Sequence, residues 1–188
     1  MPIAPIDEHG TIFYYEDSGP PRHHDLYTTV VFVHGTYYHG GIFQKTLPLA
    51  SKHALRIITY NQRDFALSTP FHASEIEQLW SEDDGTRLTW LKERGKELGR
   101  FLIWLVRNAG VIPIRDQASG KGGGISIVGW SAGNYQVLPC LAYAHELFTE
   151  EEKGLLKRYL RSYVMLGAFL GLLKLILFSQ PCTFFSET

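Results

Sequence analysis

The sequence predicts an α/β fold, a three-layer sandwich around a mostly parallel sheet. Short runs rich in apolar and β-branched residues recur along the chain, at 27–33, 55–60, 125–128 and 161–166. Segments with helical periodicity separate them, most clearly at 87–108. Strands that alternate with helices favour right-handed crossovers and a mostly parallel sheet. A third observation is the stretch Ile125–Gly133, where an apolar run enters Gly-Trp-Ser-Ala-Gly and a helix-like segment follows.

The N-terminal third is expected to supply three strands and one helix. Thr11–Glu16 is typical of a strand, and the turn residues that follow it close it. The next strand is expected at Tyr27–Val33, and it ends in His-Gly. A polar and aromatic loop then leads to a short helix near Phe43–His53, followed by a strand at Leu55–Tyr60.

Two helices are expected in the middle of the chain. Ser74 and Glu77 have the spacing of a capping box, which predicts a short helix toward Trp80. Arg87–Asn108 is the longest helical segment, stopped by glycine and proline. Its apolar face is formed by Leu91, Leu98, Phe101, Leu102 and Leu105. Pro113–Gly124 is expected to be a loop.

The last elements are two helices and a strand. Gly133–Phe148 is expected to form the helix after the Gly-Trp-Ser-Ala-Gly turn. Thr149 and Glu152 form a second capping box, which opens a helix to about Leu160. Arg161–Leu166 has the pattern of one more strand.

Composition narrows the class of protein. The 188 residues are 45% hydrophobic, enough for one domain with a core. The net charge is -1, and no basic stripe interleaves with aromatic residues, so a nucleic-acid partner is not expected. The N-terminus lacks the features of a signal peptide, and Cys140 and Cys182 do not make a disulfide framework. The sequence therefore predicts a cytoplasmic protein, and it indicates no oligomeric state.

The strand–turn–helix sequence at 125–133 predicts a nucleophile elbow at Ser131. Such a turn lifts one serine hydroxyl above the sheet, and it requires small residues where strand and helix nearly touch. Gly129 and Gly133 fill those places. With this chain's glycine and serine content, the pattern alone would arise by chance in about one chain in ten. An ordinary glycine-rich turn is therefore the alternative interpretation, and the surrounding elements argue against it.

Taken together, these motifs resemble the α/β-hydrolase superfamily, in particular its serine-hydrolase branch. The order matches over Thr11 to Met165: a strand ending in His-Gly, a strand followed by the loop Asn61–Ser68, and then the elbow. In that loop Asn61, Arg63 and Ser68 fall on the family's pattern, whereas Asp64 and Ala66 replace its two glycines. Because alanine adopts a left-handed backbone poorly, we expect the loop to take a somewhat different course.

The resemblance implies a role for each residue around Ser131. Ser131 would be the nucleophile of an acyl-enzyme route on a small ester, amide or related acyl substrate. The oxyanion hole would use the backbone N–H of Ala132 and that of Thr36 or Tyr37. His34 and Gly35 would be structural. Tyr37, Tyr38 and His39 either line a substrate pocket or are surface side chains. No metal and no organic cofactor is implied.

The other two members of a catalytic triad are missing from the expected places. The family's order is serine, acid, histidine. No aspartate follows Ser131, and the one later histidine, His145, is expected about 20 Å away at the far end of the elbow's helix. The later glutamates cluster where a helix begins, and an upstream base, His39 or His72, is disfavoured. We therefore expect a hydrolase core that lacks its last strands and is weakly active or inactive. The alternative is a non-catalytic binding or interaction protein on the same scaffold.

The sequence divides into a core, 1–166, and an apolar tail, 167–188. From Val164 to Phe178 the chain is apolar apart from Lys174. Three interpretations are open: a foreign tail from premature termination or a retained intron, a native buried strand and helix, or a tail anchor in a membrane. The anchor is disfavoured because the run is shorter than the roughly 20 residues that cross a bilayer.

Overall fold

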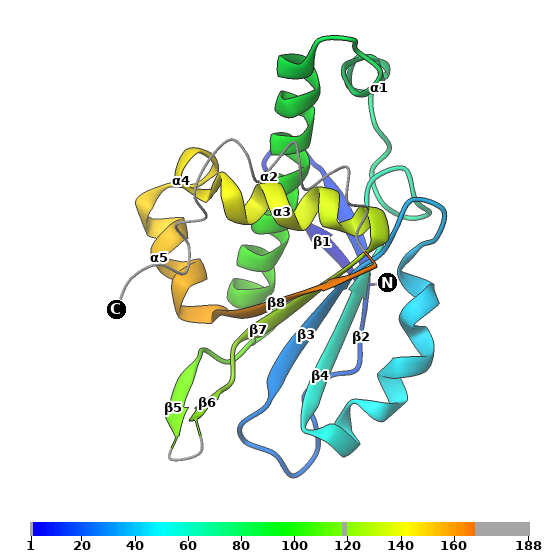
Figure 1. Cartoon of the computed structure of the whole chain (residues 1–188). Helices are drawn as coiled ribbons and strands as arrows, with labels where there is room; N and C mark the ends of the chain where they lie inside the picture. Colours follow the sequence, from blue (N-terminus) through cyan, green and yellow to red (C-terminus); the bar gives the residue numbers. More distant parts are fainter. Residues whose placement is uncertain (1, 118–119, 168–188) are drawn as a thin grey trace.

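A computed structural model of the chain describes residues 2–117 and 120–167 (Figure 1). Its main feature is a six-stranded mixed sheet with the strand order β1-β2-β4-β3-β7-β8. Helices α2 and α3 lie on one face of the sheet, and the helix η1 packs against strands β3 and β4 on the other (Figure 1). The predicted three-layer α/β arrangement is confirmed.

The pairs β3–β4, β3–β7 and β7–β8 are parallel. Strand β3 pairs with both β4 and β7, and β7 pairs with β8 at the edge of the sheet. Strands β1 and β2 are antiparallel additions on the opposite side. The sheet strands are β1 (Ile3–Pro5), β2 (Ile12–Asp17), β3 (Thr28–Val33), β4 (Leu55–Tyr60), β7 (Ile125–Trp130) and β8 (Leu160–Leu166).

Two strand pairings were missed by the sequence analysis. Strand β1 contains a proline and spans only three residues, so no alternating pattern marks it. The segment expected to be a loop contains a short hairpin, β5 (Arg115–Gln117) with β6 (Gly120–Gly122). Both short elements depend on pairing with another strand, which a local pattern does not report.

The helix α2 (Asp84–Asn108) organises the core. It starts three residues earlier than expected, because the Asp83 carboxylate accepts a hydrogen bond from the Thr86 N–H and caps it. Its apolar face buries Leu98, Phe101, Leu102 and Leu105 against the sheet. A β-carbon at Gly95 would lie 2.5 Å from the backbone nitrogen of Cys140, so α2 and α3 approach as closely as glycine permits.

The remaining helices differ from the expectation in three places. The segment near Phe43–His53 forms two 3-10 helices, η1 (Gly40–Leu49) and η2 (Ser51–His53). Helix α1 (Ala73–Leu79) begins two residues earlier than a cap at Ser74 predicts, because His72 is its N-cap and the Glu75 carboxylate accepts from the His72 N–H. The elbow's helix is divided into α3 (Asn134–Ala142) and α4 (Ala144–Leu147). The capping box at Thr149 and the helix it opens, α5 (Glu150–Tyr159), are as predicted.

Strand β8 ends at Leu166, and of the expected tail, 167–188, residues 168–188 lie outside the described residues. Among the residues that are described, no helix has the length and apolar character needed to cross a membrane.

Candidate active site

The strand β7 runs directly into a sharp turn at Ser131. Ser131 has a φ of +52°, a left-handed conformation that is unfavourable for a residue with a side chain. A 3-10 turn, η3 (Ser131–Gly133), follows at once and continues into α3. The chain thus passes from strand to helix within three residues, with the strained residue at the bend. This is the geometry that the glycine-flanked sequence predicted.

Three glycines make room for this turn. A β-carbon at Gly133 would stand 2.3 Å from the carbonyl oxygen of Val33, and one at Gly129 would stand 2.4 Å from Asn134 Oδ1. Neither distance is sterically possible. A β-carbon at Gly35 would lie 3.2 Å from that of Ser131. The ends of β3 and β7 therefore meet at Ser131. Gly133 is at a close approach to the backbone of β3, and Gly129 is at a close approach to the Asn134 side chain.

Asn134 holds the turn in place, a role that the sequence analysis missed. Its side chain is buried, and Nδ2 donates a 2.8 Å hydrogen bond to the carbonyl oxygen of Ser131. Its Oδ1 accepts a hydrogen bond from the Tyr163 hydroxyl on β8. The strained bend is thereby tied to the neighbouring strand. The sequence does show an asparagine directly after the Ser-Ala-Gly turn. Its partner Tyr163 is 29 residues further along the chain, so no local pattern indicates that the two side chains interact.

His34 is a fixed structural group. It is fully buried, its Nδ1 bonds to the carbonyl oxygen of Gly35 at 2.8 Å, and its Nε2 accepts from the Gln62 N–H at 3.0 Å. These partners require the neutral form with the proton on Nδ1. Burial lowers the pKa of His34 to about 4. Both ring nitrogens are committed to the backbone, so the ring joins the end of β3 to the loop after β4.

The loop after β4 is also tied to its surroundings by side chains. Asn61 accepts from the Gly40 N–H and donates to the carbonyl of Ala66. The Ser68 hydroxyl donates to the carbonyl of Asn61. Left-handed φ values occur at Asp64 (+66°) and Leu67 (+70°). Ala66 avoids that conformation and the following leucine takes it, so the loop departs from the glycine pattern in the way the sequence indicated.

Arg63 anchors this loop to α1 and α2 through a buried ionic cluster. Its guanidinium bonds to both oxygens of Glu75 (2.6 and 2.7 Å) and to Glu97 at 3.1 Å. Arg94 joins the cluster, 2.7 Å from Glu97. Burial disfavours ionisation of Glu75, but the hydrogen bonds from Arg63 and the His72 N–H, together with the charges of Arg63 and Arg94, outweigh it, so the pKa of that carboxyl falls to about 2. The cluster fixes the loop that flanks the elbow.

The two residues expected to complete an oxyanion hole lie just beyond Gly35. Thr36 and Tyr37 are exposed in the loop between β3 and η1, and Ala132 is half-buried in the turn after Ser131. Because Gly35 contacts the Ser131 β-carbon, the loop and the turn meet at one place.

The flanking side chains at this place are aromatic. The Tyr38 and Trp130 ring centroids are 5.4 Å apart, and the Phe43 ring lies edge-on to Trp130 at 6.2 Å. Tyr37, in contrast, is 92% exposed. Of the two aromatic candidates, Tyr38 therefore lies against the site, and Tyr37 is a surface side chain.

No histidine hydrogen-bonds the Ser131 hydroxyl within the described residues. His39 caps η1 by accepting from the Gly41 N–H at 3.1 Å. His72 begins α1 and is exposed. His145 lies on α4, beyond the break in the helix, and its nearest charged group is Glu146 at 3.4 Å.

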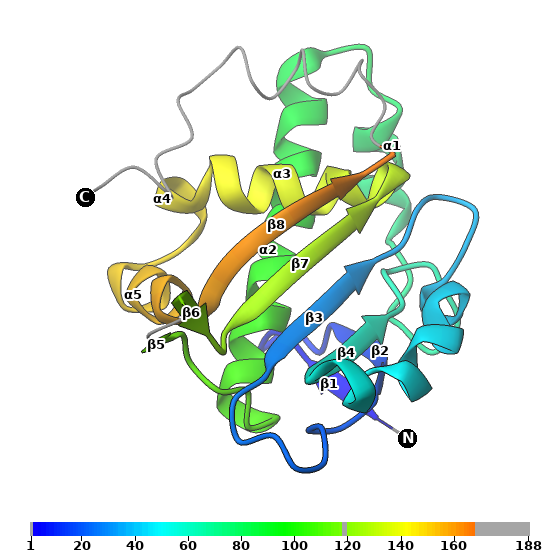
Figure 2. The ribbon, with the colours of Figure 1, turned by 60° about the horizontal axis from the view of Figure 1, so that its bottom comes forward.

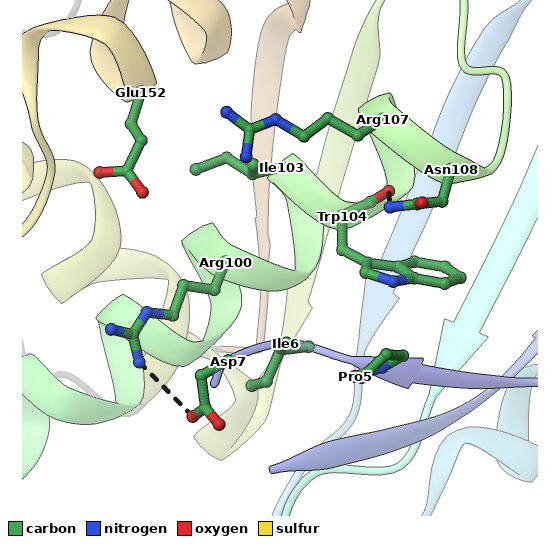
Figure 3. Close-up of a pocket in the computed structure, with 9 residues that line it drawn as sticks. All are labelled: Pro5, Ile6, Asp7, Arg100, Ile103, Trp104, Arg107, Asn108 and Glu152. Carbon is green, nitrogen blue, oxygen red and sulfur yellow. Dashed lines mark hydrogen bonds and ion pairs between the residues drawn. The ribbon is translucent and has the colours of Figure 1, made fainter. Parts of the chain in front are cut away.

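A cavity of about 240 Å³ lies elsewhere, between α2 and the N-terminal strand (Figure 3). Arg100 reaches Asp7 at 3.5 Å in its floor, and Trp104 forms one wall (Figure 3). Glu152, at the opposite wall, is engaged in the α5 capping box. None of the residues predicted for the elbow site lines this cavity.

A metal site is not formed by the residues that the structure describes, in which no group of three His, Cys, Asp or Glu side chains is arranged to hold an ion. Cys140 is a free, buried thiol on α3.

Comparison with solved structures identifies the architecture. A bromoperoxidase from Bacillus anthracis superimposes with a TM-score of 0.53 and 18% identity over 89% of this chain. An esterase from Exiguobacterium antarcticum gives 0.51 and 15% over 88%, and a carboxylesterase from Nitrososphaera gargenis gives 0.52 and 17% over 89%. The chain has the α/β-hydrolase fold.

The similarity is one of fold. No protein-family model matches the sequence, and no curated protein matches it. The chain spans 44%, 44% and 46% of the lengths of the three α/β-hydrolase-fold structures named above. Within this fold, the strand–turn–helix at Ser131 is the feature of this chain on which a functional assignment depends.

Proposed function

We propose that this protein is a serine hydrolase whose nucleophile is Ser131, and that it forms an acyl-enzyme with a small ester, amide or related acyl compound. The observation that carries the proposal is the left-handed backbone at Ser131, φ +52°, at the end of a parallel strand. A non-glycine residue in this conformation is strained, and such strain concentrates at functional sites. Here the strain lifts one hydroxyl out of the sheet edge.

The chemistry follows from where the negative charge develops. Attack of the Ser131 hydroxyl oxygen on an acyl carbon breaks the carbonyl π bond and places the charge on oxygen. That oxyanion is stabilised by backbone N–H donors about 3 Å away. Ala132 supplies one such N–H from the turn before α3, where the helix N-terminus favours negative charge. Thr36 or Tyr37 would supply the second from the loop after Gly35.

Removal of the proton from the Ser131 hydroxyl is the step for which this chain offers the least support. A serine hydroxyl is a poor nucleophile unless a base takes its proton during attack. His34 is committed to two backbone groups, and residues 168–188 contain neither histidine nor aspartate. We therefore infer that the 188-residue chain alone relies on the oxyanion hole and binding, which leave about 10³–10⁴-fold acceleration over water in such enzymes.

Acylation kinetics test the proposal. With excess p-nitrophenyl acetate, the expected result is slow release of nitrophenol together with one acetyl group per protein molecule. Ser131→Ala should remove the acetyl adduct. Tyr37→Ala, which alters an exposed side chain and keeps the backbone N–H, should retain it. An adduct that forms equally on Ser131→Ala would refute the assignment.

The second candidate is a non-catalytic binding protein on the same scaffold, and the 240 Å³ cavity at Arg100 and Trp104 favours it. Because the cavity lies away from Ser131, ligand binding in the cavity and catalysis at Ser131 can be tested independently. A ligand that raises the melting temperature of wild type and of Ser131→Ala equally, but not that of Trp104→Ala, would support binding at the cavity.

We further propose a cytoplasmic location, supported by the free, buried thiol of Cys140. Cell fractionation with a tagged chain tests it, and recovery in a secreted fraction would contradict it.

A further inference from the structure

The cavity beside α2 is formed by three elements on the helix side of the sheet. The C-terminal half of α2 passes behind the central strands there, with α5 on one side and β1 on the other (Figure 2). At about 240 Å³ the cavity is smaller than the pockets of roughly 300–1,000 Å³ that enclose drug-sized ligands. It therefore has room for a small organic molecule.

One face of α2 supplies the long side chains that border the cavity. Arg100, Trp104 and Arg107 are four and three residues apart, a spacing that places them on the same side of a helix. Ile103 lies between the two arginines on this side (Figure 3). Ile103 is 5% exposed and Ile6, beside β1, is 7% exposed, so the cavity has an apolar floor.

The two carboxylates that border the cavity already have hydrogen-bond donors from their own segments. Asp7 Oδ1 accepts from the backbone N–H groups of His9 at 3.0 Å and Thr11 at 2.9 Å. Glu152 Oε2 accepts from the N–H of Thr149 at 2.9 Å and from its hydroxyl at 3.1 Å. These contacts fix the loop after β1 and the start of α5, and they occupy both carboxylates.

The guanidinium groups, in contrast, have donors to spare. Arg100 Nη1 lies 3.5 Å from Asp7 Oδ2, and Arg107 Nη2 lies 3.4 Å from Oε1 of the exposed Glu151. Both distances are long for an N–H···O hydrogen bond, which is usually 2.9–3.0 Å. Each guanidinium has five N–H donors, and within the described part of the chain each has this one polar partner. The cavity therefore lacks acceptors more than donors.

We propose that the cavity binds a small organic anion that carries a flat apolar ring, an aromatic carboxylate. Its carboxylate accepts hydrogen bonds from Arg100 and Arg107, and guanidinium groups match carboxylates in both charge and shape. Its ring lies against the Trp104 indole over the apolar floor, since aromatic rings favour contact with one another. The negative charges of Asp7 and Glu152 disfavour a polyanion, so the ligand carries a single negative charge.

This proposal gives a ligand class to the cavity-binding candidate and does not depend on catalysis at Ser131. Two tryptophan indoles allow the two places to be distinguished, because Trp104 borders the cavity and Trp130 directly precedes Ser131. The probe is 3-phenylpropionate, titrated into the full chain while the indole N–H signals are followed by NMR. Trp104→Phe assigns the Trp104 signal.

The expected result is a saturable shift of the Trp104 signal with the Trp130 signal unmoved, in wild type and in Ser131→Ala alike. A shift of the Trp130 signal alone would place the anion at the candidate active site and overturn the proposal. The absence of a saturable shift at either signal would overturn it as well.

Arginine variants test the role of the charge. Arg107 is 54% exposed on its side chain and its partner Glu151 is 86% exposed, so Arg107→Gln removes no buried contact. Its Kd for 3-phenylpropionate should rise at least about fivefold, and Arg100→Gln should weaken binding similarly. Arg22→Gln, which replaces an exposed arginine that does not line the cavity, should leave the Kd unchanged. Equal Kd values in Arg107→Gln and Arg22→Gln would contradict the proposal.

An uncharged analogue separates the anion from the cavity itself. The alcohol 3-phenylpropan-1-ol keeps the ring and the chain length but carries no charge. Its Kd in wild type should be at least about fivefold higher than that of the acid, and Arg107→Gln should not change it. An alcohol that shifted the Trp104 signal as tightly as the acid would retain the cavity as a binding site and overturn its preference for an anion.

Discussion

The α-carbon of Gly35 faces the side chain of Ser131 so closely that a β-carbon at Gly35 would stand 3.2 Å from the Ser131 β-carbon. The two residues are 96 positions apart in the sequence and come from the ends of adjacent parallel strands, β3 and β7. Their contact brings the loop that begins at Thr36 to the turn that carries the hydroxyl. The candidate site is thus a property of the sheet, formed where two strands end side by side.

Replacing Gly133 with alanine should destabilise the fold strongly. The new β-carbon would stand 2.3 Å from the Val33 carbonyl and 2.7 Å from the His34 carbonyl, and neither backbone group can retreat without moving β3. A loss of about 3 kcal/mol in the free energy of unfolding is expected, as for other overpacked core positions. Urea denaturation measures it.

Gly154→Ala is the matched control for that variant. Gly154 is on α5, and a β-carbon there meets nothing within 4 Å. Alanine in a helix interior is expected to raise stability by about 0.5–1 kcal/mol. If both variants changed stability in the same direction, the close approach at Gly133 would not be the cause.

Ser131→Gly should stabilise the protein relative to Ser131→Ala. Both variants remove the hydroxyl, but only glycine adopts φ +52° without a steric penalty. The expected difference is about 1 kcal/mol, reduced from the full left-handed penalty by the greater freedom of glycine in the unfolded chain. Thermal unfolding of the two variants compares them, and equal melting temperatures would argue against strain at the bend.

His34 predicts a specific pH dependence of stability. Its pKa is about 4 in the folded protein, against about 6.5 when exposed. The unfolded chain therefore takes up a proton more readily, and stability that is fully present above pH 6.5 is lost as the pH falls toward 4. The loss from this one group is about 3 kcal/mol.

An NMR titration of the His34 ring checks this directly, because it reports the ring in the folded protein. The ring should stay neutral, with its proton on Nδ1, down to about pH 4. A midpoint for His34 near the ordinary histidine value of about 6.5 would contradict the buried, doubly bonded ring.

Much of the fold was predictable because local pattern and tertiary role agree. The strands at 28–33, 55–60 and 125–130 and the buried face of α2 follow from apolar periodicity. Strand β1 was not predictable, since three residues around a proline form a strand only when β2 pairs with them. The break in the elbow's helix at Tyr143 was likewise not predictable, because the helical pattern of the sequence continues through that position.

The candidate site was predictable where steric demands limit the residue type. Gly129 and Gly133 had to be small, and the sequence showed it. The clamp formed by Asn134 and Tyr163 was not predictable, because a hydrogen bond between residues 29 positions apart leaves no periodic signal. The buried pairing of Arg63 with Glu75 and Glu97 was hidden for the same reason.

Removing the Glu75 carboxylate should show how much its pairing with Arg63 contributes to the free energy of unfolding. Glu75→Ala leaves Arg63, whose side chain is 6% exposed, with Glu97 as its remaining charged partner. Breaking a buried pair costs about 3 kcal/mol or more, whereas Glu151→Ala, which removes an exposed partner of Arg107, should cost less than about 1 kcal/mol. Urea denaturation of both variants measures the contrast, and equal costs would show that the cluster does not anchor the loop.

Covalent labelling with a fluorophosphonate tests the central claim most directly, because the reagent phosphonylates a serine hydroxyl that is primed for attack and releases fluoride. Peptide mapping of the folded wild-type chain should place the phosphonyl group on Ser131, and Ser131→Ala should remain unlabelled. A cooperatively folded wild-type chain that stays unlabelled, or one labelled at another residue, would contradict the account of Ser131 as a nucleophile.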